Sequence, residues 1–132
     1  MDIEVSQHQG RVPVTVIRIK GNIDTSTYEA FQASGEEALS SGARCILLDL
    51  TDVNYISSAG FRAVSQIYKL VRGPIPPLAA AQQSQGVPDA RYLSTNLKLL
   101  RPTARVLESL KLAGFDTFLE IHTDFEQAIA SF

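Results

Sequence analysis

One stretch of the chain, residues 45–61, constrains the fold more than any other. It begins with a short apolar run, Cys45 to Leu50, whose length suits a strand buried on both faces. Polar turn-forming residues follow. Two adjacent hydroxyls, Ser57 and Ser58, come next, and an amphipathic helical pattern opens at Phe61. The stretch therefore predicts a strand, a turn, a serine pair and a helix in succession.

The position of the serine pair has a chemical meaning. The first N–H groups of a helix have no partner within the helix, and the helix dipole is positive at that end. A phosphoryl group is therefore tolerated there. The pattern taken by itself also fits a simpler role, in which Ser58 is a helix N-cap that is never modified.

Composition limits the class of protein. A chain of 132 residues suits a single domain, residues 1–132, with one sizeable core. The net charge of −2 gives no electrostatic reason to expect nucleic acid or an acidic membrane surface. Cys45 is the only cysteine, which excludes an intrachain disulfide, and its apolar setting predicts a core position. Neither a signal-peptide pattern nor an apolar run of ~18 residues is present, so we expect a cytoplasmic protein without membrane insertion.

The flanking sequence predicts an α/β fold. Alternating residues on either side of Gln9-Gly10 indicate a hairpin, with Pro13 at an edge or a strand start. Further strands and helices alternate after it. The expected strands are 3–7, 12–20, 45–50, 93–100 and 117–121, and the expected helices follow residues 24–27, 58, 101–103 and 123–124. This order predicts a mixed sheet of four to five strands packed with about four helices.

Residues 73–92 break this rhythm. Four prolines and two glycines surround a run of alanine and glutamine that lacks an apolar face. A connection of this length without periodicity is uncommon inside a compact domain. We expect an exposed insertion, either a tolerated surface loop or a binding loop.

The inventory of reactive residues argues against an enzyme. The only histidines, His8 and His122, are distant in sequence from the serine pair, and none of the common nucleophile, phosphate-loop or zinc patterns is present. Asp24, Asp49 and Asp52 could converge near strand ends, but carboxylates at such positions are more often caps than ligands of a hard cation. We therefore predict no catalytic residue, no metal and no cofactor.

Three segments carry a resemblance to a known family. Residues 48–62 closely resemble the signature of the STAS domain, in particular that of the bacterial anti-sigma-factor antagonists. Residues 21–24 look like the glycine-x-leucine-aspartate step before that family's first helix. Residues 106–115 resemble its third helix and exit turn. Apart from 73–92, the whole chain is similar in order and spacing, which implies a STAS-like α/β fold.

The resemblance also implies a function and a site. In these antagonists an aspartate-serine pair usually fills the positions of Ser57 and Ser58, and its second member is phosphorylated by a partner that is both anti-sigma factor and kinase. Ser58 is therefore the expected phosphoacceptor, with Ser57 as the second candidate. The expected partner-binding residues are Asp24, Ser57, Ser58, Gly60 and Phe61.

Asp24 and Gly60 have expected roles within this surface. The resemblance places Asp24 beside Ser58, where it could orient the hydroxyl or contact the partner. Gly60 matches the family's glycine at the helix start, and its missing Cβ would let a partner approach closely. The implied partners are an anti-sigma factor with serine kinase activity and a phosphatase, and no nucleic acid.

Two alternatives stay open. With the same fold, the chain could be a scaffold subunit of a signalling assembly or the STAS subunit of a transporter. A different class of protein would be a small nucleotide- or ligand-binding α/β domain that uses the helix start near Ser58 as an anion site.

Overall fold

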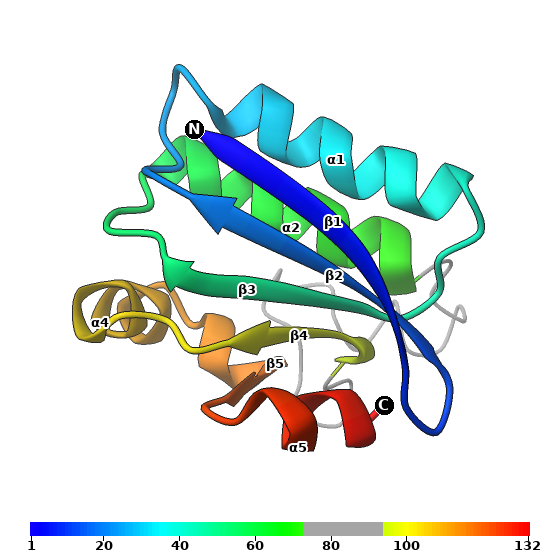
Figure 1. The fold of residues 1–132 in the computed structure, drawn as a ribbon. Coiled ribbons are helices and arrows are strands. Elements are labelled where there is room, and N and C mark those ends of the chain that lie inside the picture. The colour runs from blue at the N-terminus through cyan, green and yellow to red at the C-terminus, as the bar shows by residue number, and fades with distance from the viewer. Residues whose placement is uncertain (73–93) are drawn as a thin grey trace, which may run out of the picture.

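The computed structural model describes residues 1–72 and 94–132, which form a five-stranded sheet with strands in sequence order (Figure 1). The strands are β1 (Asp2–Gln9), β2 (Pro13–Lys20), β3 (Ile46–Asp52), β4 (Ser94–Leu100) and β5 (Leu119–His122). The helices are α1 (Tyr28–Ser40), α2 (Ser58–Arg72), α4 (Ala104–Leu112), the short 3-10 helix η2 (Phe115–Thr117) and α5 (Phe125–Ala130). The expected insertion at 73–92 lies outside the described residues.

The sheet is mixed, as the order of elements predicted. β1 pairs antiparallel with β2, and Pro13, which has no N–H for a ladder, is the first residue of β2. β2, β3, β4 and β5 pair parallel to one another. The carboxyl ends of these strands therefore share one edge of the sheet, and the turn from β3 to α2 leaves from that edge.

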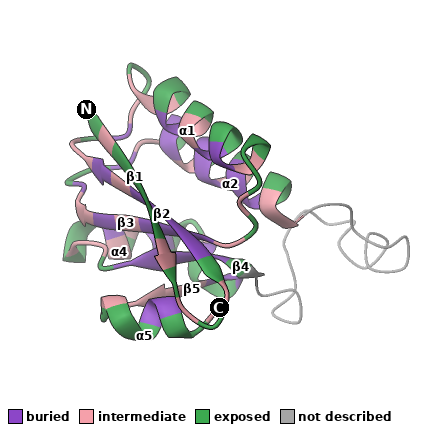
Figure 2. Cartoon of the chain, turned by 45° about the vertical axis from the view of Figure 1, so that its right-hand side comes forward, coloured by how far each residue is buried: buried purple, intermediate pink, exposed green. Residues whose placement is uncertain are grey.

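Helices cover the two faces of the sheet unequally (Figures 1 and 2). The larger core cluster joins α1, α2 and α4 to one face. A smaller cluster joins α5 to the other face. Successive residues of β3 point to opposite faces, so that Leu48 belongs to the larger cluster and Leu47 to the smaller one. β3 is thus buried on both faces, as the apolar run predicted.

A buried lysine holds the end of α5 on its face. Lys98 in β4 is only 2% exposed. Its Nζ donates to the carbonyl and to the hydroxyl of Ser131, both at 2.9 Å, and lies 3.0 Å from a carboxylate oxygen of Glu120. A buried ammonium needs such partners because an unpaired charge is costly away from water.

Two expectations about local structure need correction. Cys45 precedes β3 and lies at the margin of the core, half-buried and packed against the smaller cluster. Its carbonyl accepts from the N–H of Thr15 in β2. The last strand was expected to begin at Thr117, but Thr117 is the last residue of η2 and β5 begins at Leu119. Gly114 adopts a left-handed φ of 81°, which starts the tight turn of η2.

Within residues 1–72 and 94–132, no helix is both long enough and apolar enough to span a lipid bilayer.

Candidate functional site

The two adjacent serines at the start of α2 have different surroundings. Ser57 precedes the helix and is half-buried. Its hydroxyl accepts from the N–H of Gly60 at 3.3 Å, and its carbonyl accepts from the N–H of Phe61 at 2.9 Å. These two bonds make Ser57 the N-cap of α2. The expectation that Ser58 caps the helix is therefore wrong by one residue.

Ser58 is the first residue of α2, and its side chain is exposed. Its hydroxyl makes no hydrogen bond to any residue in the described part of the chain. The Ser57 hydroxyl, by contrast, accepts a backbone hydrogen bond in the helix cap. The two serines thus differ: Ser57 has a structural role, whereas Ser58 is exposed and makes no hydrogen bond to a described residue.

A short backbone bridge brings the turn before α1 next to the serine pair. The N–H of Ile23 donates to the carbonyl of Tyr55 at 2.9 Å, and the N–H of Ser57 donates to the carbonyl of Ile23 at 2.8 Å. Asp24 follows Ile23 directly. The turns that lead into α1 and α2 are therefore held side by side at the carboxyl edge of the sheet.

Asp24 organises its own turn. Its carboxylate accepts from the N–H of Ser26 at 2.9 Å, from the Ser26 hydroxyl at 2.7 Å and from the Thr27 hydroxyl at 3.3 Å. The hydrogen bonds from Ser26, and then those from Thr27, lower the pKa of Asp24 below its ordinary 3.8. The structure records no bond from this carboxylate to either Ser57 or Ser58. Asp24 lies near the pair but is engaged within its own loop.

Gly60 is buried beneath the serine pair. A Cβ at this position would lie 2.7 Å from Cγ2 of Ile56, 2.8 Å from the carbonyl oxygen of Ile23 and 2.9 Å from Cγ2 of Ile23. The missing side chain thus lets α2 pack closely on the bridge. The reason expected for this glycine, room for an approaching partner, is corrected: the space is taken by the protein's own core.

Phe61 anchors the first turn of α2 to the other end of the chain. Its half-buried ring stacks on Phe115 of η2 with ring centroids 5.3 Å apart. Such a contact fixes the direction in which the helix leaves the serine pair. Direct contact between Phe61 and a partner stays a prediction.

Sequence reasoning missed an aromatic residue in the turn before the pair. The side chain of Tyr55 is 41% exposed, and the guanidinium of Arg105 in α4 lies 5.6 Å from the centre of its ring. Tyr55 lies within the segment that resembles the family signature. Its contact with Arg105 crosses fifty positions of sequence, so no local pattern revealed it.

The outer face of α2 is basic. Ser58, Arg62, Gln66 and Lys69 are exposed and lie on one side of the helix, since residues three or four positions apart are neighbours. No acidic residue occurs anywhere in α2. We call these four residues the α2 stripe. It is a positively charged surface that begins at Ser58.

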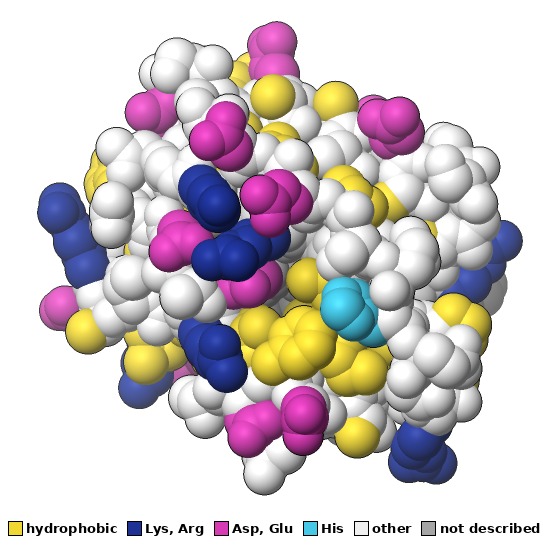
Figure 3. Space-filling model, in the orientation of Figure 1, with side chains coloured by type: hydrophobic (Ala, Val, Ile, Leu, Met, Phe, Trp, Pro, Cys, Tyr) yellow, Lys and Arg dark blue, Asp and Glu magenta, His cyan; other side chains and the backbone are white. Residues whose placement is uncertain are grey.

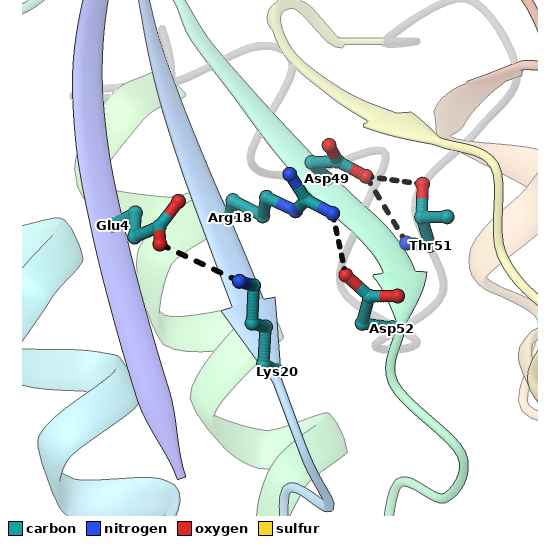
Figure 4. Close-up of polar contacts among 6 residues, drawn as sticks. All are labelled: Glu4, Arg18, Lys20, Asp49, Thr51 and Asp52. Carbon is teal, nitrogen blue, oxygen red and sulfur yellow. Dashed lines mark hydrogen bonds and ion pairs between the residues drawn. The ribbon is translucent and has the colours of Figure 1, made fainter.

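Charged side chains gather on the face of the sheet that α5 only partly covers, and four of them form two ion pairs (Figures 3 and 4). Arg18 donates to Asp52 at 2.6 Å, and Lys20 lies 3.5 Å from Glu4. The carboxylate of Asp49 accepts from the N–H and the hydroxyl of Thr51. Among the residues that the structure places, no group of three acidic, histidine or cysteine side chains is arranged to hold a metal ion.

Neither histidine lies near the serine pair at the start of α2. His8 lies within 3.0 Å of the Ser6 hydroxyl on β1, at the end of the sheet opposite the serine pair. His122 lies 3.5 Å from Glu120 at the end of β5. Among the described contacts, neither ring reaches Ser57 or Ser58. Within the described residues, neither histidine is therefore placed to take a proton from Ser57 or Ser58.

Comparisons with known proteins agree with this architecture. The sequence profile of the STAS domain matches residues 3–73. None of the curated proteins compared matches the chain in sequence. Among solved structures, an anti-sigma factor antagonist from Mycobacterium paratuberculosis is 16% identical with a TM-score of 0.71, covering 98% of this chain and 92% of its own.

Two further structures have similar folds. An anti-sigma-factor antagonist (STAS) domain protein from Planctomyces limnophilus is 16% identical with a TM-score of 0.67 and covers 98% of this chain and 96% of its own. The Bacillus cell fate determinant SpoIIAA, solved in its phosphorylated form, is 16% identical with a TM-score of 0.60 and covers 97% and 96%. At these identities the likeness concerns the fold.

Proposed function

Because the chain belongs to the STAS domain family, we propose that it is an anti-sigma-factor antagonist controlled by phosphorylation of Ser58. Its unphosphorylated form would bind an anti-sigma factor that is also a serine kinase, and so release a sigma factor. One observation carries the proposal: a surface hydroxyl with no hydrogen bond to a described residue opens α2, in a fold shared with such antagonists.

The proposed reaction takes place on the partner. Within the complex, Ser58 Oγ would attack the γ-phosphorus of ATP bound to the kinase. The bond to the β,γ-bridging oxygen breaks, ADP leaves, and the hydroxyl proton passes to a base of the kinase. This chain supplies only the acceptor hydroxyl, in keeping with the absence of a histidine near it. A phosphatase would restore the hydroxyl.

The proposed binding surface combines the two bridged turns with the α2 stripe. Asp24 and Ser57 shape it, while Tyr55, Ser58 and Arg62 are available for contact because they are exposed or partly exposed. Since the α2 stripe contains no acidic residue, a complementary partner surface would be acidic. Gly60 supports this surface from below.

Phosphorylation would act on this surface by charge. A phosphoserine adds about −1.5 to −2 charges at neutral pH. The domain tolerates them because Ser58 is exposed in the first turn of a helix. An acidic partner surface pressed against the same spot would be repelled. The switch would then work through the interface, with the fold unchanged.

Phosphate incorporation tests the proposal. The full chain and its Ser57→Ala and Ser58→Ala variants are incubated with radiolabelled ATP and each anti-sigma-factor kinase of the source organism. We expect one kinase to label the unmodified chain and Ser57→Ala but not Ser58→Ala. Labelling lost only in Ser57→Ala would move the acceptor to Ser57. If no kinase labels the chain on either serine, the phosphoswitch is wrong.

A further inference from the structure

Arg62 lies one helical turn beyond Ser58 on the α2 stripe. Both side chains are exposed, and the two positions are four residues apart in a continuous helix. At this spacing side chains leave the helix on the same face, with Cβ atoms about 5–6 Å apart. An arginine side chain is long enough to bring its guanidinium to a group attached to the Ser58 oxygen.

The guanidinium of Arg62 has no partner among the described residues. Three other cations are engaged: Arg18 with Asp52, Lys98 with Ser131 and Glu120, and Arg105 with the Tyr55 ring. Arg62 forms no ion pair or side-chain hydrogen bond with any described residue. It is available either to an incoming partner or to a new acceptor on its own helix.

We propose that Arg62 is the intramolecular partner of a phosphoryl group on Ser58. The proposal rests on the proposed function, because it concerns the same modified residue. An acidic group placed four residues before a basic one is the favourable orientation on a helix. A guanidinium also matches the oxygens of a phosphoryl group with two parallel N–H donors.

The pairing gives phosphorylation a second effect on the α2 stripe. Before modification the stripe presents two positive charges, those of Arg62 and Lys69. Afterwards the phosphoryl group both adds negative charge and draws the Arg62 guanidinium toward itself. The surface that suits an acidic partner loses its nearest cation at the moment when the repulsive group appears. One modification therefore removes an attraction as well as creating a repulsion.

The pairing can be measured without the partner. Phosphoserine is encoded at position 58 of the full chain, and the second ionisation of its phosphate is followed by phosphorus NMR between pH 4 and 8. The same titration is run with Arg62→Gln, Arg62→Lys and Arg11→Gln. Arg11 is a matched control, because it is an exposed arginine in the β1–β2 turn at the opposite end of the sheet.

We expect the phosphate pKa to rise by about 0.2 to 0.4 units in Arg62→Gln, because loss of the cation disfavours the dianion. Arg62→Lys should recover part of this shift, and Arg11→Gln should give the unmodified value. The difference between Arg62→Gln and the parent should shrink in 1 M salt. Equal phosphate pKa values in the parent and in Arg62→Gln would overturn the proposal.

The two proposals fail in different ways. If no kinase labels the chain, the proposed function is wrong. The titration of the encoded phosphoserine can still be measured, because it needs no kinase. If the phosphate pKa is the same with and without Arg62, the pairing is wrong, but kinase labelling of Ser58 can still occur. The melting temperature of unphosphorylated Arg62→Gln, expected to be unchanged, shows that the variant is folded.

Discussion

At the scale of single residues, the two neighbouring serines of the site have different roles. Ser57 and Ser58 have the same side chain, yet the Ser57 hydroxyl caps the helix and the Ser58 hydroxyl makes no hydrogen bond to a described residue. The sequence predicted that a hydroxyl would cap this helix but assigned the cap to Ser58. A shift of one residue in the start of the helix decides which serine is the N-cap. A periodic pattern of apolar residues does not fix the ends of a helix to within one residue.

Removal of each hydroxyl should therefore have different consequences for stability. Ser57→Ala is expected to lower the free energy of unfolding by about 1 kcal/mol, because the N–H of Gly60 loses its acceptor. Ser58→Ala should change it by less than about 0.5 kcal/mol, as for other exposed substitutions. Urea unfolding of the two variants measures both values. Equal losses would show that the helix start is shared between the two hydroxyls.

Asp24 gives a prediction about pH. Hydrogen bonds from Ser26 and Thr27 lower its pKa, so its ionised form stabilises the folded state. This contribution is fully present above the ordinary carboxyl pKa of 3.8 and disappears as pH falls through the lower folded value. Asp24→Asn should thus be less stable than the parent at pH 7, and the gap should narrow below about pH 4. A gap that stays constant down to pH 2 would contradict the lowered pKa.

At the scale of elements, the start of α2 is set by what lies beneath it. The bridge between Ile23 and Ile56 ties the two turns together, and Gly60 lets the helix sit directly on it. The sequence has a glycine at the expected helix start, and the resemblance aligned Gly60 with the family's glycine at this position. It could not reveal that Ile23, far along the chain, occupies the space beside it, because that contact exists only after the sheet has formed.

Gly60→Ala tests this packing. A methyl group placed within 3 Å of Ile56 and of the Ile23 backbone forces the helix or the bridge to move. Overpacking of this kind costs about 1–3 kcal/mol. A comparison substitution, Ala33→Val on the exposed face of α1, should cost at most about 0.7 kcal/mol through helix propensity alone. Unfolding curves compare the two, and an unchanged stability of Gly60→Ala would show that the bridge yields without cost.

At the scale of the whole molecule, alternating and helical periodicities predicted the order of elements and the mixed sheet. They did so because each strand and helix must bury one face whatever its neighbours are. Contacts between distant residues were beyond this reasoning. The pair of Arg18 with Asp52, the burial of Lys98 under the end of α5 and the ring of Tyr55 beneath Arg105 all depend on the register between strands or on the placement of α4.

The same architecture predicts how far a change at Ser58 should spread. The side chain is exposed, joins no described hydrogen bond and lies outside both core clusters. A carboxylate in the first turn of a helix is also locally favourable. Ser58→Asp should therefore keep the parent's melting temperature within about 2 °C, which corresponds to less than about 0.5 kcal/mol for a domain of this size.

Amide NMR spectra measure how far the effect of Ser58→Asp spreads through the molecule. In Ser58→Asp, we expect shifted resonances only in the first two turns of α2 and in the bridged segments around Ile23 and Tyr55. Gly60→Ala is the comparison that should disturb the core, since its methyl group would lie within 3 Å of Ile56 and of the Ile23 backbone. Shifts in Ser58→Asp that reach β1 or α5 would mean that the charge rearranges the sheet. The proposed switch would then act by conformational change, and an interface that merely repels its partner would be the wrong description.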